Sequence, residues 1–346
     1  MEWLQDVWFV LWGVLWGVYF LLDGYDFGVS MWLPLLGASS EKERTAMYKA
    51  TGPFWDGNEV WLITAGGVTF AAFPLAYAVL FSSLYTPLLI LLFCLILRGV
   101  IYELRFQVEN RYYRLACDGL GVVASLVATI LLGVAFSNLF RGLPLEYDAS
   151  QNFFMFRGNI LNLLHPYCLL GGVLFVLLFL YHGAVYLAWR VKGELRNKAL
   201  YMAKLVYPIF LVAFLLFVAL TFFWVGYFDA YLKSPLLFAL PVLCAVLFLA
   251  SAYYLYFKNG VGRAILSSCG GILTMTLTGV MGMYPNLIPS RLGDMAANSV
   301  SLANGSSTSP TLTIMLCVAG VMVPVVIIYQ IWAHRTLSWT VESDYQ

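Results

Sequence analysis

The chain has 346 residues, of which 62% are hydrophobic and only 11% are charged, and its mean hydropathy is +0.83. Soluble domains average about 25% charged and about 45–50% apolar residues. The composition therefore excludes a soluble protein, and a formal net charge of +1 makes nucleic acid an unexpected partner. We predict an all-α integral membrane protein, because lipid cannot satisfy the free peptide groups of other spanning structures.

Nine apolar segments are long enough to cross the roughly 30 Å hydrocarbon core as helices. In chain order they cover 7–36, 52–75, 79–104, 117–140, 162–188, 203–226, 236–257, 262–284 and 311–333. The sequence predicts a single polytopic domain over 1–346, with helices 1–4 in 1–140, helices 5–8 in 162–284 and helix 9 in 311–333. The segment 285–310 is rich in Asn, Ser and Pro, and we expect an ordered or partner-bound loop there.

Lysine and arginine residues predict the orientation, because cytoplasmic loops carry an excess of them. Fourteen of the 19 follow the odd-numbered spans: Lys42, Arg44, Lys49, Arg105, Arg111, Arg114, Arg190, Lys192, Arg196, Lys198, Lys204, Lys258, Arg263 and Arg335. Four lie on the opposite side: Arg141, Arg157, Lys233 and Arg291. The N-terminus is therefore expected outside and the C-terminus in the cytoplasm.

The cysteines and histidines do not predict a metal or haem site held by this chain alone. The six cysteines lie in or at the ends of spans without CxxC spacing, and we interpret them as small apolar core residues. His165 and His182 lie near opposite ends of the fifth span, roughly 25 Å of helix apart, so they cannot hold the same haem. His334 ends the ninth span, and a site shared by His182 and His334 is geometrically conceivable.

Ionisable residues inside spans are costly, so they are the informative ones. Asp23 and Asp26 are three residues apart in the first span and share a helix face. Asp56 and Glu59 have the same spacing in the second span, and Arg98 lies in the third. Four acids against one arginine leave excess carboxyl groups, and such a group can carry a proton. The set predicts a proton path or a buried ion site in the cytoplasmic half of the membrane.

The same residues also have a structural interpretation. Thr51 could cap the second helix, with Pro53 in its first turn. Asp56 and Glu59 would then complement the helix dipole, and Arg98 would simply neutralise one aspartate. For the five ionisable residues taken together, we favour the functional interpretation over the structural one.

Five blocks of sequence stand out in this order: DGYDFGVSM (23–31), GPFWDGNEVWLITAGG (52–67), LRGVIYELR (97–105), GVAFSNLFRGLP (133–144) and MYPNLIPS (283–290). Together they resemble subunit II of bacterial cytochrome bd quinol oxidase over nearly the whole chain, and the WDGNEVW block is the most specific. The resemblance implies two four-helix bundles plus one peripheral helix. It also implies a location in the bacterial cytoplasmic membrane.

The resemblance implies a role as the haem-free partner of subunit I. That subunit would carry two haems b and one haem d, oxidise quinol on the outer side and reduce O2 to water with cytoplasmic protons. No haem or metal ligand is expected in this chain. A small accessory subunit, and a structural quinone or membrane lipid bound here, are left open. So are two other functions, a proton- or cation-coupled secondary transporter and a purely structural subunit.

Carried over by position, the resemblance makes Asp56 the main proton-path candidate, with Asp26 as its neighbour and Asp23 nearby. Glu59 stands where the family also uses Gln, so we expect its charge to be dispensable. Arg98 matches a family arginine that would fix the carboxylates.

The resemblance also makes Trp61 a candidate for lining an O2 route, because O2 is apolar. His165 departs from the family pattern, because relatives tend to carry Asn at that position. This argues further against a role for His165 as a haem ligand.

Overall fold

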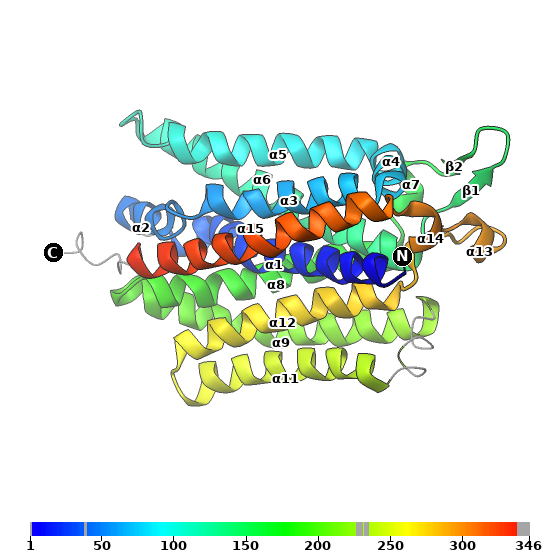
Figure 1. Cartoon of the computed structure of the whole chain (residues 1–346). Coiled ribbons are helices and arrows are strands. Elements are labelled where there is room, and N and C mark those ends of the chain that lie inside the picture. The colour runs from blue at the N-terminus through cyan, green and yellow to red at the C-terminus, as the bar shows by residue number, and fades with distance from the viewer. Residues whose placement is uncertain (1, 38–39, 226–230, 232–234, 338–346) are drawn as a thin grey trace.

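The computed structural model describes residues 2–37, 40–225, 231 and 235–337, and within these it is a bundle of long helices (Figure 1). The long helices are α1 (Glu2–Leu36), α3 (Trp55–Ala72), α5 (Tyr85–Leu104), α6 (Arg111–Arg141), α8 (Pro166–Arg190), α9 (Gly193–Val225), α11 (Pro235–Phe257), α12 (Val261–Gly282) and α15 (Ser309–Thr336). In this part of the chain, eight helices are long and apolar enough to cross a membrane, and α3 with the bent continuation α4 (Pro74–Ser83) makes a ninth. Residue 226, the predicted end of the sixth span, and Lys233 lie outside the described residues.

The second and third spans differ from the prediction at their junction. The chain bends by 120° between α3 and α4, because Pro74 has no N–H with which to continue the α3 ladder. A second break at Leu84 separates α4 from α5. The structure therefore corrects the predicted start of the third span from residue 79 to Tyr85. Helix α3 alone has 18 residues, a length of about 27 Å.

Helix α2 (Glu41–Thr51) was not predicted, and it corrects the interpretation of Thr51 as a helix cap. The Ser40 side chain caps α2 by accepting from the backbone N–H of Glu43. Thr51 is the last residue of α2, and its hydroxyl lies 2.8 Å from that of Tyr102. The residue before α3 is Phe54, which makes no side-chain cap.

The two ends of the bundle carry different elements (Figure 1). One end, called the hairpin end, holds the start of α1 together with these short elements: β1 (Leu145–Asp148), β2 (Phe153–Phe156), α7 (Ile160–Leu163), β3 (Asn286–Ile288), α13 (Met295–Asn298), β4 (Val300–Ser301) and α14 (Leu302–Gly305). Strands β1 and β2 pair antiparallel, as do β3 and β4. The segment 285–310 is therefore ordered. The opposite end, called the α2 end, holds α2 and the end of α15, so α1 and α15 both run from the hairpin end to the α2 end.

Helix α1 lies at the centre and packs against α3, α6, α8, α12 and α15. Its closest approach is to α8, where Gly28 faces Gly183, and a Cβ on Gly183 would lie 2.6 Å from the Gly28 carbonyl carbon. Helices α8, α9, α11 and α12 also pack on one another, whereas α15 contacts mainly α1 and α3. One buried core runs through all these helices except α15. The division into two four-helix bundles plus a peripheral helix stays a prediction.

Candidate functional site

Asp23, Glu59 and Arg98 meet where α1, α3 and α5 come together. Nη2 of Arg98 lies 2.7 Å from Oδ1 of Asp23 and 2.5 Å from Oε1 of Glu59. Arg98 and Asp23 are buried, whereas the Glu59 side chain is 22% exposed. The Arg98 guanidinium also lies 4.1 Å from the centroid of the Phe27 ring, which adds a cation–π attraction. One buried cation therefore balances carboxylates from two other helices and holds three helices together.

Asp26 has a different environment from Asp23, although both are fully buried. Its Oδ2 accepts a hydrogen bond of 2.7 Å from Nδ2 of Asn58, on α3. Its Oδ1 has no hydrogen-bond partner among the described residues, and none of their lysines or arginines lies within ion-pair distance of it. An ionised carboxylate is costly to bury without a cation. The Asp26 carboxyl group is therefore suited to holding a proton.

Asp56 lies in the first turn of α3 and is exposed on the surface of the chain. Among the residues that the structure describes, no hydrogen bond or ion pair joins it to Asp23, Asp26, Glu59 or Arg98. Four of the five ionisable residues singled out in the sequence therefore come together on α1, α3 and α5. Asp56 lies on the outer surface of the same helix as Glu59.

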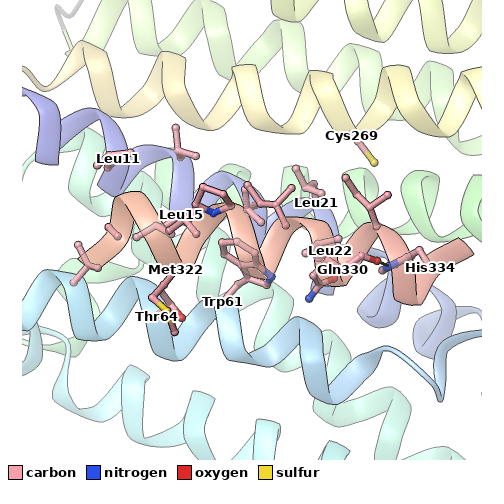
Figure 2. Close-up of a pocket in the computed structure, with 18 of the residues that line it drawn as sticks. Leu11, Leu15, Leu21, Leu22, Trp61, Thr64, Cys269, Met322, Gln330 and His334 are labelled. Carbon is pink, nitrogen blue, oxygen red and sulfur yellow. Dashed lines mark hydrogen bonds between the residues drawn. The ribbon is translucent and has the colours of Figure 1, made fainter. Parts of the chain in front are cut away.

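Trp61 is buried and lines an apolar groove of about 1200 Å³ between α1, α3, α8, α12 and α15. Figure 2 shows Trp61 and Thr64 of α3 on one side of α15, with Leu15 and Leu22 of α1 behind it. Gln330 and His334 of α15 lie at the α2 end of this groove. The lining is almost wholly apolar along the rest of its length.

Ring nitrogens of His182 and His165 are engaged in hydrogen bonds within this chain, which does not favour either residue as a haem ligand. Both ring nitrogens of His182 are engaged, Nδ1 at 2.8 Å from Oγ of Ser268 and Nε2 at 2.9 Å from the Leu21 carbonyl oxygen. His165 caps α8, and its ring accepts from the backbone N–H of Tyr167. Burial, and then nearby Arg141, lower the pKa of His165 and so favour its neutral form. The described residues contain no group of three or more His, Cys, Asp or Glu that could hold a metal ion.

A second charge cluster lies at the α2 end, where α2, the end of α5 and the first turns of α6 meet. Nε of Arg105 lies 2.5 Å from Oδ1 of Asp118, and its Nη2 lies 3.0 Å from Oε1 of Glu41. The Arg105 guanidinium also packs over the ring of Tyr48, at 4.7 Å from the centroid. Burial, and then the Asp118 carboxylate, raise the pKa of the Tyr48 hydroxyl. This cluster anchors α2 to α5 and α6.

Sequence reasoning did not assign Asn58 or Tyr25 to the site, and it considered His334 only as a conceivable partner of His182. Asn58 lies in the WDGNEVW block and Tyr25 lies in the GYDFG block, beside residues that were chosen for their charge. Both carry polar groups inside a span, which is the signal that could have found them. Nothing in the sequence places His334 near Tyr25, because their hydrogen bond joins residues 309 positions apart.

These features define a polytopic membrane protein that holds ionisable side chains inside its helix bundle. The family model for cytochrome bd terminal oxidase subunit II matches residues 4–337. The chain is 34% identical over 334 residues to cytochrome bd ubiquinol oxidase subunit 2 of Bacillus subtilis (strain 168), covering 96% of each chain. It is 32% identical over 364 residues to cytochrome bd-I ubiquinol oxidase subunit 2 of Escherichia coli (strain K12), covering 96% of this chain and 94% of that one. The chain therefore belongs to the cytochrome bd terminal oxidase subunit II family.

The fold agrees with this family. The chain superposes on a chain in the structure of bd oxidase from Geobacillus thermodenitrificans with a TM-score of 0.78 at 14% identity, covering 97% of this chain and 99% of that chain. The protein is thus a multi-pass inner-membrane subunit of a respiratory terminal quinol oxidase. It works with a partner subunit I in a complex that contains haem.

Proposed function

We propose that this chain supplies protons from the α2 end to its oxidase complex, with Asp26 and Asp56 as the proton-carrying groups. The observation that supports this most directly is the environment of Asp26. It is a fully buried carboxyl group whose hydrogen-bond partner is the Asn58 amide rather than a cation. A carboxyl group held in this way can gain and lose a proton without breaking an ion pair.

The proposal includes an orientation with the α2 end in the cytoplasm. Basic residues gather at this end, in α2 and in the turns that join α5 to α6, α8 to α9 and α11 to α12. Among the described residues, only Arg141, Arg157 and Arg291 belong to the hairpin end. This asymmetry agrees with the positive-inside rule.

Each ionisable residue then has a distinct task. Asp26 takes up a proton on its carboxyl oxygen from the α2 end. Asp56, exposed on α3, receives protons at the surface and hands them to the partner subunit. Arg98, bound to Asp23 and Glu59, fixes the helices that carry these groups. The two haems b, haem d and the quinol site would belong to subunit I, so every step described here involves side chains of this chain.

The apolar groove beside Trp61 supports a second task, access of O2. A small apolar molecule partitions into an apolar, water-poor passage, and this groove runs along most of the length of α15. A bulky polar substitution in the groove, such as Thr64→Gln, is expected to raise the KM for O2 without changing kcat at saturating O2. An unchanged KM for O2 would place the route elsewhere.

The test of the proton role uses the complete oxidase complex with Asp26→Asn or Asp56→Asn. General acid–base groups typically contribute about 10²–10⁴-fold to a rate, so we expect O2 consumption to fall at least about tenfold. The reduced-minus-oxidised haem spectrum and the amount of assembled complex should not change. The control is Glu146→Gln, which removes an exposed carboxylate at the hairpin end. Wild-type turnover in both aspartate variants would refute the proposal, and loss of assembly would favour a structural role.

A further inference from the structure

Hydrogen bonds lead from Asp26 to a histidine near the end of α15. Nδ2 of Asn58 lies 2.7 Å from both Oδ2 of Asp26 and the hydroxyl oxygen of Tyr25. That hydroxyl lies 3.3 Å from Nε2 of His334. We infer that His334 takes up protons at the α2 end and that Tyr25 passes them to Asp26. This inference deepens the proposed function and rests on it.

The protonation pattern of His334 suits this role. Nδ1 lies 2.9 Å from the Gln330 carbonyl oxygen, which can only accept, so Nδ1 carries a hydrogen. In the neutral ring, Nε2 is then free to accept the Tyr25 hydroxyl, and it is also the atom that gains a proton. The ring stacks on Phe54, with centroids 4.2 Å apart and planes at 19°, and this stacking fixes the direction of Nε2.

His334 lies where a proton can reach it. It is partly exposed, it lines the groove at the α2 end and it lies in the last turn of α15. Figure 2 shows His334 and Gln330 together at this end of α15, and Leu11 marks the other end of the groove. Imidazole is the side chain best suited to gaining and losing a proton between pH 5 and 8. By contrast, His182 is fully buried with both nitrogens engaged.

The charged groups around His334 favour onward transfer. Arg190 lies behind Phe54, with its guanidinium carbon 5.1 Å from that ring's centroid, and Arg335 follows His334 on its own helix. From α1 the facing group is the Tyr25 hydroxyl. Among the residues that the structure describes, no carboxylate forms an ion pair with His334, so an imidazolium there is a short-lived carrier rather than half of an ion pair.

The last step is short enough for one water molecule. The Tyr25 hydroxyl and Oδ2 of Asp26 both lie 2.7 Å from the same Asn58 nitrogen, so they are at most twice that distance apart. A proton moves from Nε2 of His334 to the Tyr25 oxygen, while the hydroxyl's own proton moves through the water to Asp26. His334 becomes neutral, Asp26 becomes protonated and Tyr25 is unchanged. The Asn58 amide does not take part in the transfer. Its N–H groups donate to both oxygens and so hold them in position.

The experiment measures O2 consumption by the complete complex carrying His334→Gln or Tyr25→Phe. Glutamine can hydrogen-bond Tyr25 but cannot carry a proton, and phenylalanine keeps the ring that stacks on Tyr186 at 3.8 Å. We expect both variants to turn over at least about tenfold more slowly, with unchanged haem spectra and assembly. A His334→Gly variant should be equally slow and should recover turnover when imidazole is added. The control His165→Asn removes an imidazole at the hairpin end while keeping a good helix cap, and it should behave as wild type.

Each outcome bears on a different claim. Slow turnover in Asp26→Asn together with wild-type turnover in His334→Gln overturns this inference and leaves the proposed function standing. Wild-type turnover in Asp26→Asn overturns this inference, and wild-type turnover in Asp56→Asn as well overturns the proposed function too. If His334→Gly is slow, imidazole does not rescue it and His334→Gln restores the rate, His334 has only a structural role and the inference fails. Slow turnover in His334→Gln and Tyr25→Phe with imidazole rescue supports it.

Discussion

Asp23 and Asp26 lie three residues apart on α1 and are both fully buried, yet their surroundings differ. Asp23 faces the Arg98 guanidinium at 2.7 Å, and Glu59 approaches the same nitrogen. Asp26 faces the Asn58 amide, which links it to Tyr25. A carboxylate beside a buried cation has its charge compensated by that cation, whereas one bound only to an amide does not. The two carboxyl groups thus differ in their partner rather than in residue type or depth, and it is on this difference that we propose a structural role for Asp23 and a proton-carrying role for Asp26.

The largest expected effect comes from removing the shared cation with Arg98→Gln. Two carboxylates lose their partner, and Asp23 is left buried and unpaired. Breaking a buried ion pair from one side typically costs about 3–5 kcal/mol. We expect little assembled complex, measured as the yield of haem-bearing complex that co-purifies with this chain in mild detergent.

The double variant Arg98→Gln with Asp23→Asn is the matched control for that change. It removes both buried charges at once, so it should recover part of the lost assembly. If the double variant assembles no better than Arg98→Gln alone, the pair does not act as a charge-compensating unit.

The second effect concerns the helix crossing that fixes α1 next to both aspartates. An added Cβ at Gly28 would overlap the backbone carbonyl oxygen of Phe179 on α8, and backbone cannot move aside as a side chain can. Overpacking typically costs about 1–3 kcal/mol, and we expect Gly28→Ala to reach the upper end of that range. The measurement is the midpoint of thermal unfolding of the complex. Gly66→Ala is the control, because a Cβ there meets nothing within 4 Å, and equal losses in both variants would contradict the close crossing.

A smaller effect separates the two aspartates directly. Asp23→Asn removes a charge-assisted contact to Arg98, worth about 2 kcal/mol, while Glu59 keeps the cation partly balanced. Asp26→Asn removes one hydrogen bond to an amide, worth about 1 kcal/mol, but it should slow turnover. Thermal unfolding and O2 consumption are measured for both. The comparison fails if Asp23→Asn lowers turnover as much as Asp26→Asn while leaving stability intact.

The sequence could predict the long helices and which ionisable side chains lie within them. It could not predict which side chains those residues contact. Hydropathy located α6 and α8 within about six residues of their ends, because lipid forces apolar residues into continuous helices. It placed the break between the second and third spans at 76–78, which lies inside α4, because α3, α4 and α5 are all apolar and hydropathy alone does not locate the bend at Pro74. Spacing placed Asp23 and Asp26 on one face, yet their partners depend on how α3 and α5 are rotated against α1. His334 reaches Tyr25 only because α15 packs on α1, and no local pattern encodes that contact.

The smallest expected loss of stability comes from changing Glu59, the second carboxylate beside Arg98. Its side chain is 22% exposed, so solvent screens its charge, and Arg98 keeps the buried Asp23 when Glu59→Gln is made. A glutamine can still accept from the guanidinium, so the loss should stay below about 1 kcal/mol, with turnover unchanged. The unfolding midpoint of the complex, compared with that of Asp23→Asn, measures the difference. A drop as large as for Asp23→Asn would mean that Arg98 needs both carboxylates. Arg98 would then depend on Asp23 and Glu59 alike, rather than on the buried Asp23 alone. Glu59 would have a structural role like that of Asp23.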